Sequence, residues 1–287
     1  MMKSKMRDDF AVFILTHGRP NNVITYNTLK KLNYNGKYYL VIDNEDKKGN
    51  EYIEKYGKEN VVIFDKLKIS KEFDTIDNSE ERKTVVYARN ACFKIAKEKN
   101  IKYFLELDDD YNEFRVRYEK NGILSSAKIK DINELFNLMI NFLIKSGADT
   151  VALAQGGDYI GGVGSKVWKD KLSRKAMNTF FCTTDRQFNF IGRINEDVNT
   201  YTSRAIKGNL FFTIANVMIN QMATQTNAGG MTDVYLDSGT YVKSFFTIIT
   251  SPSCTKISTM GNKFKRIHHK ILWNKCTPKI INEKWKK

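Results

Sequence analysis

A continuous run of six apolar residues, Phe10–Leu15, constrains the fold of this chain more than any other feature. A short run without polar alternation is typical of a strand buried on both faces, as in a parallel sheet covered by helices. Further strands are predicted at Lys37–Ile42, Val61–Phe64 and Tyr103–Leu107, with amphipathic or charged segments between them. Strands that alternate with helices over short connections predict right-handed βαβ units.

Helices are predicted between these strands. The first opens at Pro20 and reaches about Leu32, the second covers Asn50–Tyr56, and the third covers Glu80–Glu98, where apolar side chains recur on one face. The stretch Asp65–Lys83 is highly charged and is predicted as a surface loop.

The pattern continues to residue 154 and then weakens. Phe114–Ser126 alternates around a Lys-Asn-Gly turn and predicts a hairpin, which a helix at Asp131–Ser146 and a strand at Thr150–Ala154 follow. No Pro- or Ser-rich linker marks a second domain. The sequence therefore predicts one α/β domain over residues 1–287, with a Rossmann-type, mainly parallel sheet flanked by helices in 1–155 and an irregular elaboration in 156–287.

The chain carries 47 Lys and Arg against 32 Asp and Glu, a formal charge of +15. Such an excess favours a polyanionic partner, such as nucleic acid, an anionic membrane or a phosphorylated substrate. Charge alone does not choose among these partners, and a solvated basic surface explains it equally well.

The sequence predicts neither secretion nor a membrane span. The amino terminus has no apolar segment followed by a small-residue cleavage site, and the apolar stretch Leu210–Met222 is too short and too polar to cross a bilayer. We expect a soluble cytoplasmic protein. Its four scattered cysteines, expected as reduced core thiols, are Cys92, Cys182, Cys254 and Cys276.

Polar residues follow three of the predicted strands directly. Ligands of open parallel sheets bind beyond the carboxyl ends of the strands. At those ends the chain has Thr16-His17-Gly18-Arg19, Asp43-Asn44-Glu45-Asp46 and Asp108-Asp109-Asp110. A cationic side chain, a hydrogen-bonding acid and a carboxylate cluster together indicate a site for a nucleoside diphosphate and a divalent metal.

Three consecutive aspartates repel one another unless a cation neutralises them. Asp108 and Asp110 could act as a pair, one on the metal and one on a ribose hydroxyl. Oxygen ligands of this kind suit Mg2+ or Mn2+. The alternative is a plain solvated turn.

Arg89-Asn90 stands within the predicted helix that precedes the acidic turn. The planar fork of Arg89 can bind two oxygens of a diphosphate. By spacing alone, an ion pair of Arg89 with Glu80 or Glu81 is the more ordinary reading. Neither a GxGxxG sequence nor a phosphate-binding P-loop is present.

These features together resemble a nucleotide-sugar glycosyltransferase of the GT-A fold, and more specifically the TET/JBP-associated glycosyltransferases of phages and related sources. The resembling blocks occur in the expected order over nearly the whole chain. They are Phe13–Pro20, Val41–Glu45, Ala88–Asn90, Leu105–Asp110, Asn195–Val198, Tyr235–Thr240 and Arg266–Lys270 with Trp273.

The resemblance implies transfer of a sugar, with glucose as first choice, from a UDP-sugar to the hydroxyl of a 5-hydroxymethylpyrimidine in DNA. A partner hydroxylase would make that hydroxyl, and a phage-encoded enzyme would act in the cytoplasm of a bacterial host. Asp108 and Asp110 would form the metal motif. By position, the donor would be held by Thr16, His17, Arg19, Asp43, Arg89, Asn90, Asp108 and Asp109.

Enzymes of the GT-A fold often complete the metal shell with a histidine near the carboxyl terminus. The resemblance makes His268 and His269 the candidates, and imidazole ligands favour Mn2+ over Mg2+. The alternative is that both histidines belong to a basic, DNA-facing strand, Lys263–Lys270.

Glu196-Asp197 matches the acceptor-side acidic pair of inverting GT-A enzymes, with Asp197 as the candidate general base. Acids at the start of a helix are also favourable without any catalytic role. Asp158 and Asp237 are rival candidates.

Two segments interleave basic residues with tryptophan and could contact DNA, Lys166–Lys175 and Lys263–Lys287. Surface lysines and core tryptophans explain them nearly as well. Two alternative functions stay open: a glycosyltransferase with a glycan or protein acceptor, and a non-catalytic DNA-binding protein on the same scaffold.

Overall fold

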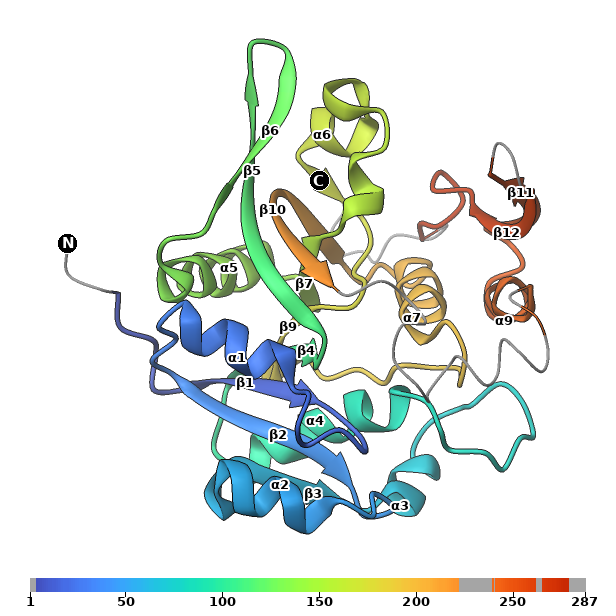
Figure 1. Cartoon of the computed structure of the whole chain (residues 1–287). Helices are drawn as coiled ribbons and strands as arrows, with labels where there is room; N and C mark the ends of the chain where they lie inside the picture. Colours follow the sequence, from blue (N-terminus) through green and yellow to red (C-terminus); the bar gives the residue numbers. More distant parts are fainter. Residues whose placement is uncertain (1–3, 222–238, 240, 262–264, 279–287) are drawn as a thin grey trace.

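The computed structural model describes residues 4–221, 239, 241–261 and 265–278. One ten-stranded sheet runs through the molecule, with helices against both of its faces (Figure 1). Within the described residues, none of the helices is both long enough and apolar enough to span a bilayer. The predicted α/β fold is confirmed.

The first four strands form the parallel half of the sheet, in the order β3-β2-β1-β4. Their residues are strongly apolar and pack on both faces, as the sequence predicts. The bounds are β1 Phe10–Leu15, β2 Lys37–Asp43, β3 Val61–Phe64 and β4 Tyr103–Asp108. The helices of this half are α1 Ile24–Lys31, α2 Gly49–Tyr56, α3 Lys66–Ser70 and α4 Val86–Glu98.

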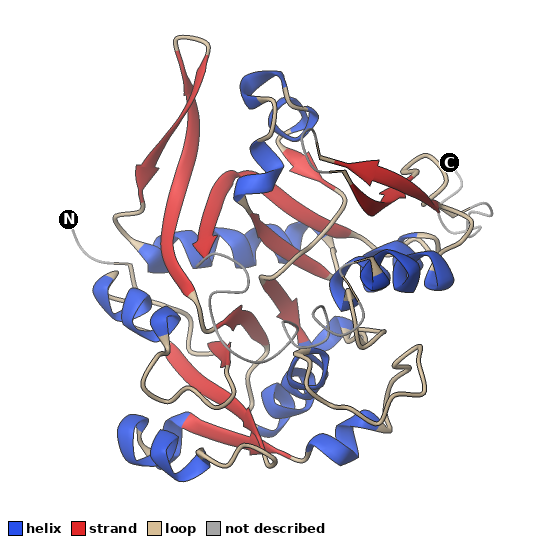
Figure 2. Cartoon of the chain, turned by 45° about the vertical axis from the view of Figure 1, so that its right-hand side comes forward, coloured by secondary structure: helices blue, strands red, loops and turns tan. Residues whose placement is uncertain are grey.

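The sheet continues beyond β4 through strands from both halves of the chain, in the order β9-β7-β10-β5-β6. Figure 2 draws the strands in red. The pairings make β1, β2, β3, β4, β6, β7 and β10 point one way and β5, β8 and β9 the other. The bounds are β5 Tyr111–Lys120, β6 Ile123–Lys128, β7 Thr150–Ala154, β8 Leu172–Ser173, β9 Phe180–Thr183 and β10 Phe211–Gln221.

The remaining helices and strands follow or flank this sheet. The helix α5 covers Ile132–Ser146 and is capped by the Asp131 side chain. A second, two-stranded sheet pairs β11 with β12. The other bounds are α6 Lys166–Asp170, α7 Glu196–Ala205, α9 Val242–Thr250, β11 Thr255–Met260 and β12 Arg266–Ile271.

Three sequence expectations about local structure need correction. The helix expected from Pro20 begins only at Ile24, because the chain first makes a turn closed by the Asn22 amide on the Arg19 carbonyl. The helix expected from Glu80 begins at Val86. The expected loop after Asp65 contains α3, whose first turn is capped when the Lys68 amide donates to the Asp65 carboxylate.

The expectation that residues 156–287 only elaborate the sheet irregularly is also corrected. β9 and β10 lie inside the main sheet, and β10 joins β7 to β5. Polar residues such as Asn216 and Asn220 interrupt the alternation of β10, so its strand pattern is weak in the sequence. The segment between β7 and β9 is indeed mostly short turns.

Apolar clusters on the two faces of the sheet fix where its strands end. One cluster packs side chains of α1, α2 and α5 against the sheet, and the other packs α4 and α7 on the opposite face. Phe10, Phe136 and Phe181 meet at the centre of the first cluster, with ring centroids 5.6–6.4 Å apart. This packing holds the carboxyl ends of β1, β2 and β4 at one edge.

Candidate functional site

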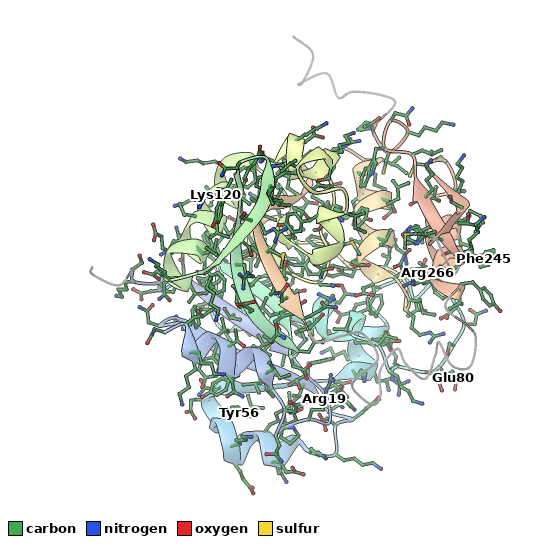
Figure 3. The ribbon with its side chains drawn as sticks, turned by 45° about the horizontal axis from the view of Figure 1, so that its top comes forward. Arg19, Tyr56, Glu80, Lys120, Phe245 and Arg266 are labelled. Carbon is green, nitrogen blue, oxygen red and sulfur yellow. The ribbon has the colours of Figure 1, made fainter. Side chains whose placement is uncertain are left out.

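The polar residues predicted at the strand ends lie at one edge of the sheet. In the parallel register, Leu15 of β1 pairs with Asp108 of β4 on one side and with Val41 of β2 on the other. Thr16 and Asp43 therefore emerge beside the acidic turn that follows β4. Figure 3 labels Arg19 to the right of Tyr56, the last residue of α2.

The three aspartates of the turn have different surroundings. Asp109 is buried, accepts a hydrogen bond of 2.6 Å from the Thr16 hydroxyl, and pairs with the Arg19 guanidinium at 3.2 Å. Burial raises the pKa of Asp109, although Arg19 and Thr16 oppose that effect. Asp109 thus ties the loop after β1 to the end of β4.

Asp108 and Asp110 are the two aspartates of the turn whose carboxyl groups remain partly exposed to a ligand. Burial and the two neighbouring carboxylates raise the pKa of Asp110 to about 7. Within the described part of the chain, no Lys, Arg or His pairs with the Asp110 carboxylate. Asp108 keeps a partly exposed side chain beside it. Two adjoining carboxylates, one without a cationic partner, fit a divalent cation such as Mn2+ or Mg2+.

The loop after β1 and the end of β2 form a second, cationic group. His17 hydrogen-bonds to Asp43 at 2.8 Å, and Lys66 pairs with the same carboxylate at 3.2 Å. The bond to Asp43 raises the pKa of His17, so the ring holds its positive charge to higher pH. Gly18 adopts a φ of +69°, which favours glycine, and its amide donates to the Asp46 carboxylate at 2.6 Å.

Arg89 is almost fully buried and lies among three carboxylates. Its guanidinium donates to Asp108 at 3.1 Å and to Glu196 at 3.1 Å, and lies 3.8 Å from Glu106. Burial alone would lower the pKa of Arg89, but these carboxylates raise it overall. The alternative pairing with Glu80 or Glu81 is wrong, because Arg89 points into the sheet edge.

Asn90 faces a different neighbour. Its amide nitrogen donates to the Phe190 carbonyl at 3.0 Å, and its oxygen accepts from the Phe190 amide at 2.8 Å. Asn90 thereby anchors the chain that leads to α7. The structure leaves neither amide atom turned toward the aspartate turn.

Glu196 and Asp197 form the first turn of α7, next to Arg89. The residue before them, Asn195, takes a left-handed conformation with φ +60°, which turns the chain into the helix. Burial and the Asp197 charge raise the pKa of Glu196 to about 7, against the attraction of Arg89. Burial likewise raises the pKa of Asp197, whose carboxylate accepts from the Val198 amide at 2.7 Å. Arg89 thus links Asp108 of the predicted metal motif to Glu196, the neighbour of the predicted base.

The two rival acids are placed differently. Asp158 is engaged on both oxygens, because it accepts from the Gln155 amide and pairs with Lys175. Asp237 lies outside the described residues.

His268 and His269 lie on β12, with ring centroids 4.4 Å apart. Among the residues that the structure describes, no three His, Cys, Asp or Glu side chains converge as metal ligands do. The structure therefore does not bring either histidine together with Asp108 and Asp110. The charge of Lys243 acts both on Asp197 and on the two histidines, and it lowers the pKa of each of these three groups.

Several residues of the site were not predicted from the sequence. Tyr52 hydrogen-bonds to the Thr16 hydroxyl and to the Arg19 amide, and the Tyr111 hydroxyl donates to Asp108 at 3.2 Å. Glu106 is fully buried within β4. A charged residue inside an apolar strand was the one available signal, since a buried acid needs a cationic partner.

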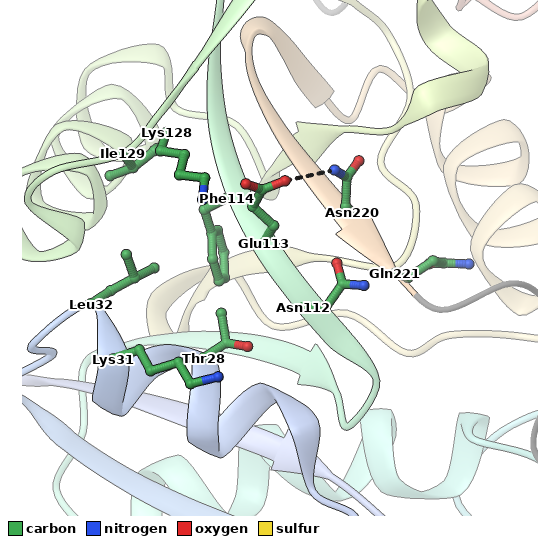
Figure 4. A pocket seen from close by; sticks show the side chains of 10 residues that line it. All are labelled: Thr28, Lys31, Leu32, Asn112, Glu113, Phe114, Lys128, Ile129, Asn220 and Gln221. Carbon is green, nitrogen blue, oxygen red and sulfur yellow. Dashed lines mark hydrogen bonds between the residues drawn. The ribbon is translucent and has the colours of Figure 1, made fainter.

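A groove opens beside this edge between α1 and the strands β5 and β10 (Figure 4). Its volume is about 660 Å3. Lys31 and Lys128 line it, and Glu113 of β5 accepts a hydrogen bond of 3.2 Å from Asn220 of the neighbouring strand β10. Asn112 and Gln221 bring the groove close to the acidic turn.

Comparison with known proteins gives one family and several solved structures. The TET-Associated Glycosyltransferase family matches residues 10–230. No curated protein gives a significant match.

Two of the similar solved structures are of glucosyl-3-phosphoglycerate synthase from Mycobacterium tuberculosis. The complex with Mn2+, UDP and phosphoglyceric acid is 7% identical, with a TM-score of 0.47, over 92% of this chain and 87% of that chain. The complex with Mg2+ and UDP is 6% identical, with a TM-score of 0.48, over 91% and 87%.

Proposed function

Because this chain belongs to the TET-Associated Glycosyltransferase family and is a glycosyltransferase, we propose that it moves a sugar from a UDP-sugar to a 5-hydroxymethylpyrimidine in DNA. Glucose is the first candidate sugar. Mn2+ or Mg2+ is the candidate metal, because the aspartates supply oxygen ligands and neither histidine joins them. The proposal includes a partner hydroxylase that supplies the acceptor hydroxyl, and action in the cytoplasm.

One observation carries the proposal: Arg89 joins the acidic turn after β4 to the acidic pair that opens α7. It holds Asp108 at 3.1 Å on one side and Glu196 at 3.1 Å on the other. A sugar transferred between a metal-bound diphosphate and an acceptor hydroxyl needs a cation site and a base close together. The two acidic groups, linked through one side chain, meet that requirement.

On the donor side, Thr16, His17, Arg19 and Asp43 would hold the nucleoside diphosphate. The raised pKa of His17 supports a positive ring beside an anionic donor. Asp108 and Asp110 would hold the cation, which when bound would neutralise negative charge developing on the departing diphosphate. Arg89 would keep Asp108 oriented from within the fold. Asp109 serves mainly to fix the loop.

On the acceptor side, Asp197 would accept the proton of the attacking hydroxyl, which corresponds to an inverting reaction. An alcohol is a weak acid, so the carboxylate takes the proton as the new bond forms. Its raised pKa makes it a stronger base than an exposed aspartate. Glu196 is held by Arg89 and would orient its neighbour.

The DNA acceptor is supported by the family name and by the net charge of +15. Transfer to a glycan or protein is the second candidate acceptor chemistry, because the donor side would be the same. A non-catalytic DNA-binding protein is disfavoured, since Asp108, Asp110 and the linked acidic pair need not persist without catalysis.

The test is UDP release from a panel of UDP-sugars in the presence of Mn2+. Three duplex DNAs of the same sequence serve as acceptors, containing hydroxymethylcytosine, hydroxymethyluracil or only unmodified bases. The proposal predicts release that depends on a hydroxylated base. Release that is equal with all three DNAs and without DNA would contradict the acceptor but leave a glycosyltransferase.

A further inference from the structure

The carboxyl-terminal part of the chain is segregated in charge. No Asp or Glu occurs between Ser238 and Asn282. This contrasts with the whole chain, of which 28% is charged with both signs mixed. The Lys and Arg residues in the same stretch are Lys243, Lys256, Lys263, Lys265, Arg266, Lys270, Lys275 and Lys279.

The antiparallel pair of β11 and β12 places like charges opposite one another. Lys256 pairs in register with Lys270, and Ser258 with His268. Since side chains alternate along a strand, Lys270, His268 and Arg266 share one face of β12. We call this face, with Lys256 across from it, the basic ribbon.

Like charges directly opposite on a strand pair are destabilising unless an anion lies between them. Lys256, Arg266 and Lys270 are exposed. None of the three forms an ion pair with another described residue. Within the part of the chain that the structure describes, the positive charge of the basic ribbon is therefore not neutralised. Figure 3 labels Arg266 beside the red ribbon of the carboxyl-terminal strands.

The positive charges of Arg266 and Lys243 change the pKa of side chains in and near the basic ribbon. Burial, and after it the charges of Arg266 and Lys243, lower the pKa of His268. Burial and Arg266 lower the pKa of Lys243, which Asp197 alone raises. His269 is 8% exposed, and its Nδ1 has no hydrogen-bond partner among the described residues. His269 therefore lies on the opposite, buried face of β12 and is not part of the basic ribbon.

The hairpin that carries the basic ribbon packs on α9, which in turn packs on α7. On α9, the Thr247 hydroxyl donates to the Asn199 side chain of α7 at 2.9 Å. Ser251 hydrogen-bonds to Thr202 at 3.0 Å. Trp273, just after β12, stacks on Tyr201 with centroids 5.8 Å apart. The ribbon is therefore connected, through α9 and Trp273, to the helix that begins with Glu196 and Asp197.

We propose that the basic ribbon binds the phosphate backbone of the DNA acceptor and holds it against the start of α7. From Arg266 to Lys270 the strand extends about 13 Å, which suits a row of phosphates better than one phosphate. This inference rests on the proposed function, because it takes the acceptor to be DNA. It also gives β12 a role other than metal ligation.

The test measures DNA affinity against salt concentration for the full chain and two variants. One variant is Lys256→Ser with Lys270→Ser. The matched control is Lys58→Ser with Lys145→Ser, which removes the same number of positive charges. Lys58 lies just before β3 and Lys145 on α5, and both are exposed. Both elements lie away from β11 and β12 (Figure 1). Each phosphate contact contributes about 0.9 to the slope of log affinity on log salt.

The ribbon variant is expected to lose about 1.8 in that slope and on the order of tenfold in affinity at physiological salt. The control is expected to keep the wild-type slope. The melting temperature of the ribbon variant should be no lower than that of wild type, because a repulsion is removed.

Equal slopes for both variants would overturn the ribbon proposal and leave the DNA acceptor standing. A wild-type chain that does not bind DNA would overturn both proposals together. Binding to anionic lipid vesicles that only the ribbon variant loses, with unchanged DNA affinity, would assign the surface to a membrane instead.

Discussion

Arg89 is the residue on which the candidate site depends most. It is 1% exposed and is the cation shared by Glu106, Asp108 and Glu196. Burial raises the pKa of Glu106 well above its ordinary value despite the nearby guanidinium. The negative charges of Asp108 and Glu196 are therefore balanced by the guanidinium of Arg89.

Replacing Arg89 by Met is expected to destabilise the fold by about 3–5 kcal/mol, because it leaves buried carboxylates without a cation. The measurement is urea unfolding. The control is Arg7→Met, which breaks the half-exposed pair with Asp9 and should cost about 1 kcal/mol or less. Equal effects of the two substitutions would show that Arg89 is not the balancing charge.

Glu196 should make stability depend on pH. Its pKa is raised from an ordinary 4.5 to about 7, so between these values the folded chain holds a proton that the unfolded chain releases. The free energy of unfolding should therefore fall, relative to that of Glu196→Gln, as pH rises from about 5 to 7. Exposed Glu51→Gln controls for loss of a carboxylate. A constant difference between wild type and Glu196→Gln across this range would refute the shift.

At the scale of elements, the turn between β4 and β5 is the candidate cation site. Mn2+ is expected to raise the melting temperature of the wild-type chain, since binding to the folded state alone stabilises it. Asp110→Asn should abolish this rise and should not lower the metal-free melting temperature, because it relieves repulsion among Asp108, Asp109 and Asp110.

Asp170→Asn, at an exposed aspartate on α6, is the matched control for that experiment. It should keep the full response to Mn2+. A response of the same size in both variants would exclude the turn as the cation site.

The strands of the parallel half are predictable from sequence because short apolar runs report burial on both faces. β1, β3 and β7 begin and end where the sequence predicts. Helix starts are less predictable, since they depend on turns and caps such as Asp65 at α3. β10 is missed because its polar residues hide its period, although it lies in the middle of the sheet.

Part of the site follows from the same logic. Residues directly after parallel strands share an edge, so Thr16, Asp43 and Asp108 could be grouped in advance. The link from Arg89 to Glu196 could not, because it joins residues 107 positions apart that only the folded chain brings together. The closeness of Lys243 to Asp197 and to the histidine pair could not be predicted either, since it depends on how α9 packs on α7.

At the scale of the whole molecule, charges of opposite sign gather in different places. Negative charge gathers at the strand ends and at the start of α7, where the turn after β4 and the pair Glu196-Asp197 lie close to Arg89. Positive charge dominates the carboxyl-terminal hairpin. The positive hairpin would thus attract the proposed polyanionic acceptor. The acidic site would bind the proposed cation and, through it, the donor.

The most direct test is mass analysis of nucleosides from hydroxymethylated DNA incubated with the chain, a UDP-sugar and Mn2+. The account predicts a mass gain of one sugar residue on the hydroxymethylpyrimidine alone, which Asp110→Asn and Asp197→Asn abolish and Asp170→Asn retains. Unchanged nucleosides with every donor, from a folded wild-type chain that binds DNA, would contradict it.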